Sequence, residues 1–489
     1  MSDADNLIQS EIDNALFNFK NANYHEAIKI LEKLKKKQTH FIIYWYLGHS
    51  YFRIYNYSSA IECIKKSIEL KEPDTLNLNF LAEILLATND YKEAIKVLNK
   101  ILEKDKNNAV SIFKLAKIYL EIGELEKAEK YFNEAVKCDP TNLEIQYELS
   151  KINKKYLTAD LLKNLEKKQI TQDTNNLNDV FSKLIIAENC KNNKNFESEI
   201  GNLAEAHNLY LQKRERAANQ EFNYFTNLLP KFISKTKDKK FKIDCDLKPI
   251  FIMGLPRSGS TLIESVISSN NDKIEIGGEV GAISKVFYSE NIISNYDLKE
   301  LKFNFNFKKE DFEKLKFSIL KQYQELKINT NKDFFTDKSL ENFLYIELIS
   351  KIFPKAKFVY CKRNKYANFL GILKVFLPNL LWSHSTQKII NIMNLYENNL
   401  KKIINENKIK IKIIELENFS NNPIDVSKDL FNFLGIDWNN KILENAKSQN
   451  KRIQTVSNLQ VRKKISKHDL GYLDDYFPFL HNLDIEKLV

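Results

Sequence analysis

The sequence predicts two parts of different fold class: an N-terminal all-helical solenoid, and a C-terminal α/β domain with a parallel central sheet. Three observations predict this division. A helical pattern recurs at a nearly constant interval in the first part. In the second part, a short apolar run passes through a glycine-containing turn into a helical pattern. A strand–helix–strand pattern then follows, which is typical of parallel sheets.

Composition excludes several classes of protein. The chain has 489 residues, 43% of them hydrophobic and 28% charged, which suits two to four domains with real cores. No run approaches the roughly 18 apolar residues of a membrane span. The acidic N-terminus does not read as a signal peptide. Five cysteines lie far apart without a C-x-x-C pair, so we expect no metal and a reducing, cytoplasmic location.

The formal net charge of +11 raises the question of an anionic partner. The lysines are spread along the predicted helices among Glu and Asn, and they do not form one basic block. Most of them are therefore expected to lie on solvated faces. We expect no nucleic-acid partner, and the excess positive charge suits an enzyme that handles an anionic nucleotide.

The repeating part is marked by Ala27, Ala60, Ala94 and Ala128, at steps of 33, 34 and 34 residues. The sequence around each alanine is similar. Small residues upstream of each one let the two helices of a repeat pack closely against each other. The pattern resembles tetratricopeptide repeats (TPR). We expect about four repeats within residues 1–155, then a helical, degenerate TPR-like extension and linker over residues 156–245. Such arrays often bind a peptide or protein partner in their groove, although a purely scaffolding role stays open.

The α/β part, residues 246–489, opens on the apolar run Ile250–Met253. The turn from Gly254 to Gly259 follows, and a helical pattern starts at Ser260. A loop entering a helix N-terminus in this way aims N–H groups and a positive dipole end at an anion. Ser260 stands where a nucleotide-binding P-loop carries lysine. The cation of this turn is instead Arg257, so the loop suits a phosphate or sulfate without the usual contact to ATP.

Further motifs follow in order. Gly277-Gly278-Glu279 comes after the first helical pattern, and Lys338 ends the predicted strand Phe334–Thr336. A strand over residues 357–361 leads to Arg363. Another strand is expected over Ile409–Phe419, and the segment T-x-S-x-x-Q-V-R spans residues 455–462.

Together these motifs resemble the sulfotransferases that use 3′-phosphoadenosine 5′-phosphosulfate (PAPS), in particular bacterial TPR-linked and tyrosylprotein-sulfotransferase-like enzymes. The resemblance covers most of residues 249–480 and implies a P-loop-like fold without a metal. It implies that Glu279 is the general base and that Arg257 and Lys338 stabilise developing charge. The residues that the resemblance implies for donor binding are Arg257, Ser258, Gly259, Ser260, Thr261, Arg363, Ser457 and Arg462.

Several alternatives stay open. The family carries a serine that binds the 3′-phosphate where this chain has Gly371, so the chain could be a TPR adaptor with a decayed nucleotide site. A P-loop kinase is the other competitor, although it would need the missing lysine. His384 is a rival to Glu279 as the base. The hydroxyl acceptor could be peptidyl tyrosine, a glycan, a lipid or a small molecule.

Overall fold

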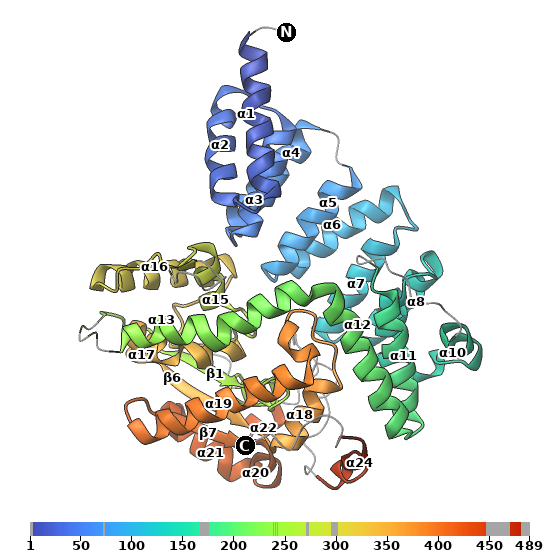
Figure 1. Ribbon diagram of the computed structural model, residues 1–489, viewed down its shortest axis with the longest axis vertical. Helices are drawn as coiled ribbons and strands as arrows, with labels where there is room; N and C mark the ends of the chain where they lie inside the picture. Colours follow the sequence, from blue (N-terminus) through green and yellow to red (C-terminus); the bar gives the residue numbers. More distant parts are fainter. Residues whose placement is uncertain are drawn as a thin grey trace.

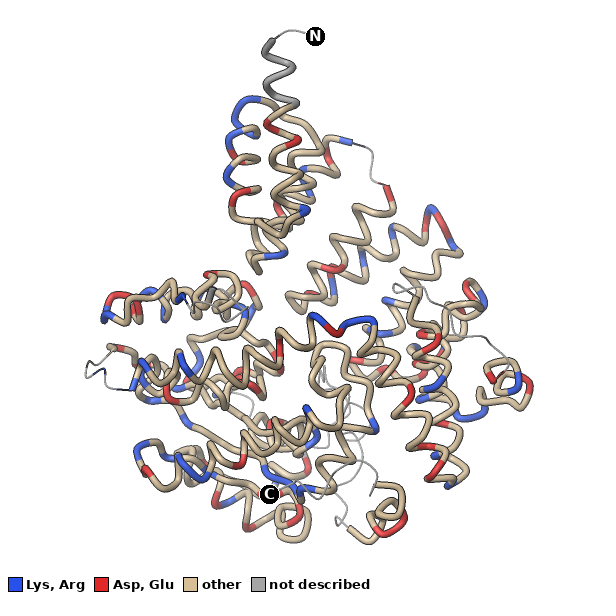
Figure 2. The backbone as a smooth tube through the Cα atoms, viewed as in Figure 1, with Lys and Arg blue, Asp and Glu red and all other residues tan. Residues whose placement is uncertain are grey.

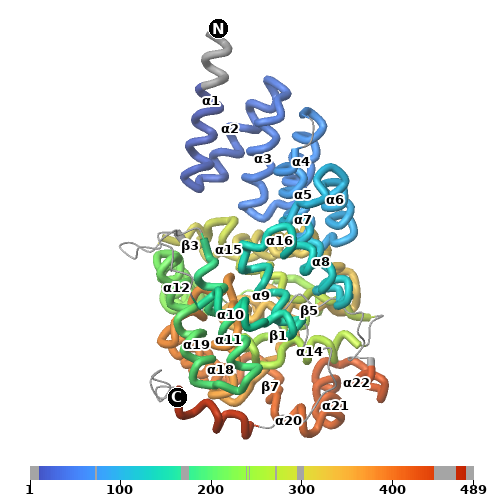
Figure 3. The backbone as a smooth tube through the Cα atoms, turned by 90° about the vertical axis from the view of Figure 1, so that its right-hand side faces the viewer, coloured from blue at the N-terminus to red at the C-terminus, as the bar shows by residue number. Residues whose placement is uncertain are grey.

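The structure is a computed structural model of the whole chain (Figure 1). It describes residues 3–71, 74–166, 176–237, 239, 241, 243–269, 273–294, 302–445 and 470–480. An array of helix pairs extends from the N-terminus along the long axis, and the sheet domain lies at the other end. Figure 3, turned by 90°, shows the same succession, with α20 and α24 among the elements farthest from the N-terminus.

The array consists of antiparallel helix pairs whose small residues allow close packing. Ala27, Ala60, Ala94 and Ala128 are all fully buried. A Cβ added to Gly48 would lie 2.5 Å from Cδ1 of Ile64 on the paired helix, so the predicted close approach is confirmed. The helices are α1 (Asp3–Lys20), α2 (Tyr24–Lys37), α3 (Phe41–Arg53), α4 (Tyr57–Leu70), α5 (Thr75–Ala87), α6 (Tyr91–Lys104), α7 (Ala109–Ile122), α8 (Leu125–Cys138) and α9 (Leu143–Ile152).

Several of these helices begin on Asn or Asp, because a short polar side chain can accept a bond from an otherwise unpaired N–H group of the first turn. The Asn56 side chain accepts from the backbone N–H of Ser59, and Asp74 accepts in the same way from Asn77. These caps fix where several helices of the array start.

A second helical region connects the array to the sheet domain. Its elements are η1 (Lys154–Tyr156), α10 (Ala159–Glu166), α11 (Asn178–Asn192), α12 (Phe196–Asn223), η2 (Tyr224–Leu228) and α13 (Leu229–Thr236). Residues 159–166 of the predicted helical extension form α10. The long helix α12 packs against the C-terminal half of the chain at η4 (Leu381–His384) and α24 (Phe477–Leu480) (Figure 1).

The sheet has five strands in the order β2-β5-β1-β6-β7, and all of its pairs are parallel. In the register of the central pair, Gly254 lies opposite Cys361. Since the chain leaves β1 toward one edge and β6 toward the other, their carboxyl ends flank a topological switch point, the usual ligand position in such sheets. The strands are β1 (Pro249–Gly254), β2 (Ile274–Glu275), β5 (Phe334–Asp337), β6 (Lys357–Lys362) and β7 (Ile411–Glu415).

Helices cover both faces of this sheet, and β1 is buried on both sides. Ile250 and Ile252 contribute to a core on the face that α14 and α21 cover, whereas Phe251 and Met253 contribute to the core of the opposite face. The remaining elements are α14 (Ser260–Ile267), α15 (Ala282–Ser289), β3 (Ile293–Ser294), β4 (Lys302–Phe303), α16 (Lys309–Glu325), η3 (Leu340–Tyr345), α17 (Ile346–Ile352), α18 (Lys365–Leu373), α19 (Thr386–Glu406), α20 (Leu416–Asn421), α21 (Pro423–Leu434), α22 (Ile442–Asn445) and η5 (Gly471–Leu473).

One predicted strand was too long. We expected extended structure over Ile409–Phe419, but β7 ends at Glu415 and residues 416–421 form α20. The apolar side chain of Phe419 remains in the core, because a helical turn brings it under the sheet beside Leu430.

Charged residues of both signs alternate along the backbone throughout the described parts (Figure 2). Lys338 is the one buried lysine in the part of the chain that the structure describes, which agrees with the expectation that most lysines lie on solvated faces. Among the described residues, no helix combines the length and the apolar character that a membrane-spanning segment needs.

Candidate active site

The turn after β1 has the backbone shape of an anion cradle. Arg257 adopts a positive φ of 67° and Gly259 one of 93°, and α14 starts directly at Ser260. The first N–H groups of a helix have no acceptor within it and point along its axis. The Ser258 hydroxyl is buried, and no described group forms a hydrogen bond with it. A buried donor directed into an anion-binding turn fits a phosphate or sulfate oxygen.

The guanidinium of Arg363 contacts this turn, and its charge acts on Arg257. Nη1 of Arg363, just beyond β6, donates to the backbone O of Arg257 at 3.1 Å, and its Nη2 donates to the Tyr472 hydroxyl at 3.2 Å. Burial, and then the like charge of Arg363, lower the pKa of Arg257 to about 10. Like charges held this close are stabilised by a bound anion between them.

Gly371 explains how Arg363 reaches the turn. A Cβ at position 371 would lie 3.1 Å from Nη1 of Arg363 and 3.2 Å from Cβ of Arg257. The space that a serine side chain would need is therefore taken by the two arginines. A serine at this position would require the Arg363 guanidinium to move by a few tenths of an ångström.

Lys338, at the end of β5, forms an ion pair with Glu279. Its Nζ lies 2.6 Å from Oε1 of Glu279, and the lysine side chain is only 1% exposed, whereas that of Glu279 is 42% exposed. Burial lowers the pKa of Lys338, but the charges of Glu279 and Glu264 outweigh this, so the pKa is raised overall. The ammonium therefore stays charged, while one side of the carboxylate can reach a substrate.

Glu264 fixes the segment that carries Glu279. This buried residue of α14 accepts hydrogen bonds from the Gly278 N–H at 3.0 Å and from the Thr336 hydroxyl at 2.8 Å. Thr336 Oγ1 also accepts from the N–H of Gly277 at 2.9 Å. Burial raises the pKa of Glu264, and Lys338 opposes that rise. The helix behind the anion cradle and the segment with Glu279 thus form one hydrogen-bonded unit.

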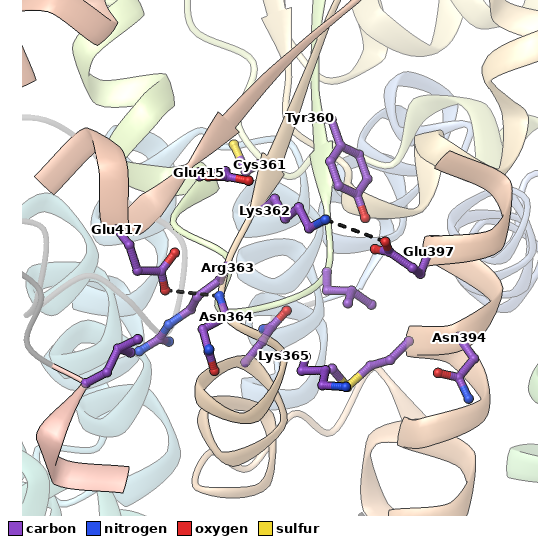
Figure 4. Close-up of a pocket in the computed structure, with 14 residues that line it drawn as sticks. Tyr360, Cys361, Lys362, Arg363, Asn364, Lys365, Asn394, Glu397, Glu415 and Glu417 are labelled. Atoms are coloured by element: carbon purple, nitrogen blue, oxygen red, sulfur yellow. Dashed lines mark hydrogen bonds and ion pairs between the residues drawn. The ribbon is translucent and has the colours of Figure 1, made fainter. Parts of the chain in front are cut away.

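A cavity of about 360 Å³ opens at the carboxyl ends of β6 and β7 (Figure 4). It carries both signs of charge. The Asn364 N–H donates to Oε1 of Glu417 at 3.0 Å, and Nζ of Lys362 lies 3.5 Å from Oε1 of Glu397. Asn368 joins this wall to the turn, because its Nδ2 donates to the backbone O of Pro256 at 2.6 Å.

The structure brings most of the predicted site residues to one edge of the sheet. The turn contributes Arg257, Ser258 and Gly259, and α14 begins with Ser260 and Thr261. Lys338 and Arg363 follow β5 and β6. Glu279 is linked to this group through its ion pair and through the charge by which it raises the pKa of Arg257. Ser457 and Arg462 lie outside the described residues.

His384 does not have the geometry of a base for an acceptor. The residue is 4% exposed. Its Nδ1 lies 2.8 Å from Nδ1 of His207 on α12, and its Nε2 lies 3.1 Å from the backbone O of Leu377. Burial lowers its pKa to about 3. Both ring nitrogens are engaged within the protein, which opposes a role for His384 as the base and leaves Glu279 as the candidate.

Three contacts of the site were not predicted from the sequence: those that Glu264, Asn368 and Tyr472 make. A carboxylate inside the apolar stripe of a predicted helix was a usable signal for Glu264, because a buried acid requires partners. Asn368 and Tyr472 gave no such signal, since their contacts join segments more than 100 residues apart, at separations of 112 and 109.

A turn with the backbone shape of an anion cradle, at the switch point of a parallel sheet and preceded by a helical array, describes a repeat protein with a C-terminal α/β domain. Comparison with family models is more specific. Residues 249–440 match the sulfotransferase family, residues 85–152 match a tetratricopeptide repeat, and residues 20–101 match subunit 3 of the anaphase-promoting complex, or cyclosome. The chain thus combines tetratricopeptide repeats with a sulfotransferase-family domain.

Individual relatives are distant. A protein of Aquifex aeolicus (strain VF5), described as uncharacterized, is 28% identical over 227 residues, which are 45% of this chain and 29% of that protein. A sulfotransferase from Mycobacterium tuberculosis H37Rv is 11% identical, with a TM-score of 0.28, over 64% of this chain and 98% of its own. MamA from Desulfovibrio magneticus RS-1 is 19% identical, with a TM-score of 0.29, over 32% of this chain and 86% of its own.

The described residues contain no group of three or more His, Cys, Asp or Glu side chains arranged to hold a metal ion. The cations near the turn are instead guanidinium and ammonium groups. Charge on a bound anion would be balanced by Arg257, Arg363 and Lys338.

Proposed function

We propose that this chain is a sulfotransferase that moves a sulfuryl group from PAPS to a hydroxyl acceptor. The observation that carries the proposal is the Lys338–Glu279 ion pair, which stands at the same sheet edge as the cradle formed by Arg257 and Ser258. A cradle alone fits any anion. A cradle together with a buried cation and a half-exposed carboxylate fits a group transfer that requires proton removal.

The donor supplies a sulfuryl group attached to a phosphate leaving group. In the proposal, N–H groups from Arg257 to Thr261 and the Ser258 hydroxyl bind the phosphosulfate end, and Arg363 binds the 3′-phosphate. The fork of a guanidinium suits phosphate oxygens. Ser457 and Arg462 stay candidates for further phosphate contacts.

Two charged residues act on the reacting atoms in this proposal. Glu279 accepts the acceptor's hydroxyl proton as the new S–O bond forms, and its exposed side is open to that hydroxyl. Lys338 stabilises the negative charge that develops on the bridging oxygen as the old S–O bond breaks. One such donor is typically worth about 3–4 kcal/mol of transition-state stabilisation.

The test combines transfer and binding measurements. With PAPS and a panel of hydroxyl acceptors, Glu279→Gln should reduce transfer by about 10²–10⁴-fold, the usual contribution of general base catalysis. Its affinity for adenosine 3′,5′-bisphosphate should not fall, because Glu279 supplies no donor to the cradle and its replacement removes a negative charge that acts on Arg257. Glu275→Gln is the matched control: this carboxylate lies four residues away and pairs with Lys332 at 3.1 Å.

Arg257→Met and Arg363→Met should weaken bisphosphate binding instead. Calorimetry also separates this proposal from its competitor, a TPR adaptor with a decayed site. The competitor is favoured by Gly371, which stands where the resembling family carries a serine that binds the 3′-phosphate. Heat on titration with adenosine 3′,5′-bisphosphate supports the enzyme, whereas its absence in the wild-type protein supports the adaptor. Tight binding of ATP with Mg²⁺ but not of the bisphosphate would point to a kinase.

The acceptor is proposed to be a protein, with peptidyl tyrosine as the first candidate and the TPR array as the platform that holds it. Labelled donor incubated with cell lysate tests this, because label that migrates with protein supports a protein acceptor. Label in a glycan, lipid or small-molecule fraction would reject it.

A further inference from the structure

Lys285 connects the repeat array to the segment that carries Glu279. It lies in the first turn of α15, and its Nζ donates to the backbone O of Val280 at 2.8 Å. The same ammonium lies over two rings of the array, 5.9 Å from the centroid of Tyr55 and 5.7 Å from that of Tyr57. A cation over aromatic rings at this distance is attracted to both.

The array is held at this place by polar contacts on either side of the rings. Glu325 of α16 accepts hydrogen bonds from both the N–H and the hydroxyl of Ser58, each at 2.7 Å. Nε2 of His25 lies 2.7 Å from the backbone O of Ser289, at the end of α15. Because both contacts involve elements adjoining the Glu279 segment, the position of the rings relative to Lys285 is fixed.

The rest of the segment is anchored on the sheet side. The Gly281 N–H donates to the Ser339 hydroxyl at 2.6 Å, and the Gly278 O accepts from the Lys338 N–H at 2.9 Å. Between these points lies Val280, whose carbonyl bonds to Lys285. The contact with Lys285 is therefore where the array acts on the backbone next to Glu279.

Burial and two nearby carboxylates have opposite effects on the pKa of Lys285. Burial lowers its pKa to about 8, while the charges of Glu341 and Asp337 oppose this fall. Glu341 is itself tied to α15, because the Ser284 hydroxyl donates to its Oε1 at 3.1 Å. A largely buried ammonium needs partners. For Lys285 these are the carbonyl of Val280 in its own domain and the rings of Tyr55 and Tyr57 in the array.

We infer that Lys285 is a positioning residue through which the TPR array orients the Glu279 segment for transfer. This inference rests on the proposed function. The array then has a second role besides any binding of the acceptor: a displacement of Tyr55 and Tyr57 alters the position of the base without any contact to the donor.

The experiment compares Lys285→Met with Lys285→Arg in the full-length protein. Loss of the ammonium should lower kcat about tenfold, since small displacements of a catalytic group are costly, and leave the KM for PAPS within about twofold. Lys285→Arg, which keeps the cation and its donors, should recover most of kcat. Tyr57→Leu should lower kcat as Lys285→Met does, whereas Tyr57→Phe keeps the ring and should not.

Hydrogen exchange separates failure of this inference from failure of the proposed function. Lys285→Met should speed amide exchange in residues 277–283 by about tenfold, and this readout does not require activity. Unchanged exchange and unchanged kcat overturn the inference even if the wild-type protein transfers sulfate. Faster exchange in a protein that transfers nothing supports the structural coupling and rejects the sulfotransferase assignment. A parallel rise in KM for PAPS would reject the positioning role.

Discussion

Replacing Lys338 by methionine removes the cation between two carboxylates and keeps a side chain of similar length. Its Nζ contacts Glu279 at 2.6 Å, and its charge also acts on the buried Glu264. Two unit charges about 4 Å apart interact by about 4 kcal/mol at an effective dielectric constant of about 20. Breaking a buried ion pair typically costs about 3–5 kcal/mol.

The expected loss is smaller here, because the Glu279 side chain is 42% exposed and water replaces part of the interaction. We expect the free energy of unfolding at pH 7.5 to fall by about 2–3 kcal/mol. Most of this loss comes from Glu264, which cannot be hydrated. The hydrogen bonds from Gly278 and Thr336 remain, but they do not balance the charge of Glu264, so proton binding becomes more favourable.

The loss should depend on pH. Burial already raises the pKa of Glu264, and Lys338 opposes that rise, so the variant raises this pKa further. A carboxyl whose folded-state pKa lies above its unfolded value binds a proton more readily in the folded state. Stability therefore falls as pH rises from the unfolded value of about 4.5 through the folded one. The deficit of Lys338→Met relative to wild type should be small at pH 4.5 and large at pH 7.5.

Urea unfolding followed by tryptophan fluorescence at both pH values measures this. The double variant Lys338→Met/Glu264→Gln is the control, since it removes the unpaired charge and should recover much of the stability at pH 7.5. A deficit of equal size at both pH values, or no recovery in the double variant, would refute the electrostatic explanation.

Three further predictions concern single positions. Gly371→Ser should weaken binding of adenosine 3′,5′-bisphosphate in calorimetry about tenfold, because its Cβ displaces the Arg363 guanidinium; tighter binding would contradict this. Tyr476→Phe should lower the unfolding free energy by about 1–2 kcal/mol, because its hydroxyl donates to the buried Glu199 at 2.7 Å, and an unchanged urea midpoint would count against it. His384→Asn should destabilise the protein and leave the pH profile of kcat/KM in its wild-type form; loss of the acidic limb of that profile would restore the histidine as base.

Regular features of the fold were predictable from local pattern. The recurring alanines predict helix pairs, since only a small side chain allows the close approach seen between Gly48 and Ile64. The apolar run Ile250–Met253 predicts a strand buried on both faces, because it lacks alternation. The end of β7 was missed, because Leu416 and Phe419 suit a strand and a helical turn equally well.

The candidate site was predictable where one segment carries its own geometry. The turn around Arg257 was visible because its glycines and the helix that follows are contiguous in sequence. The partnership of Glu264 with Gly278 was not, because it depends on how the helix packs behind the sheet. The coupling of Lys285 to Tyr57 was equally hidden, since it joins two domains across more than 200 residues.

Helix α12 has a consequence for anyone who wishes to study the sulfotransferase-family domain by itself. The buried carboxylate of Glu199 on this helix holds both Lys374 and Tyr476, and His207 meets His384. A fragment that starts at residue 246 would lose those partners. The side chains that α12 now covers in the C-terminal domain would then be exposed to solvent. Truncation should therefore begin upstream of residue 178, so that α11 and α12 travel with the sheet.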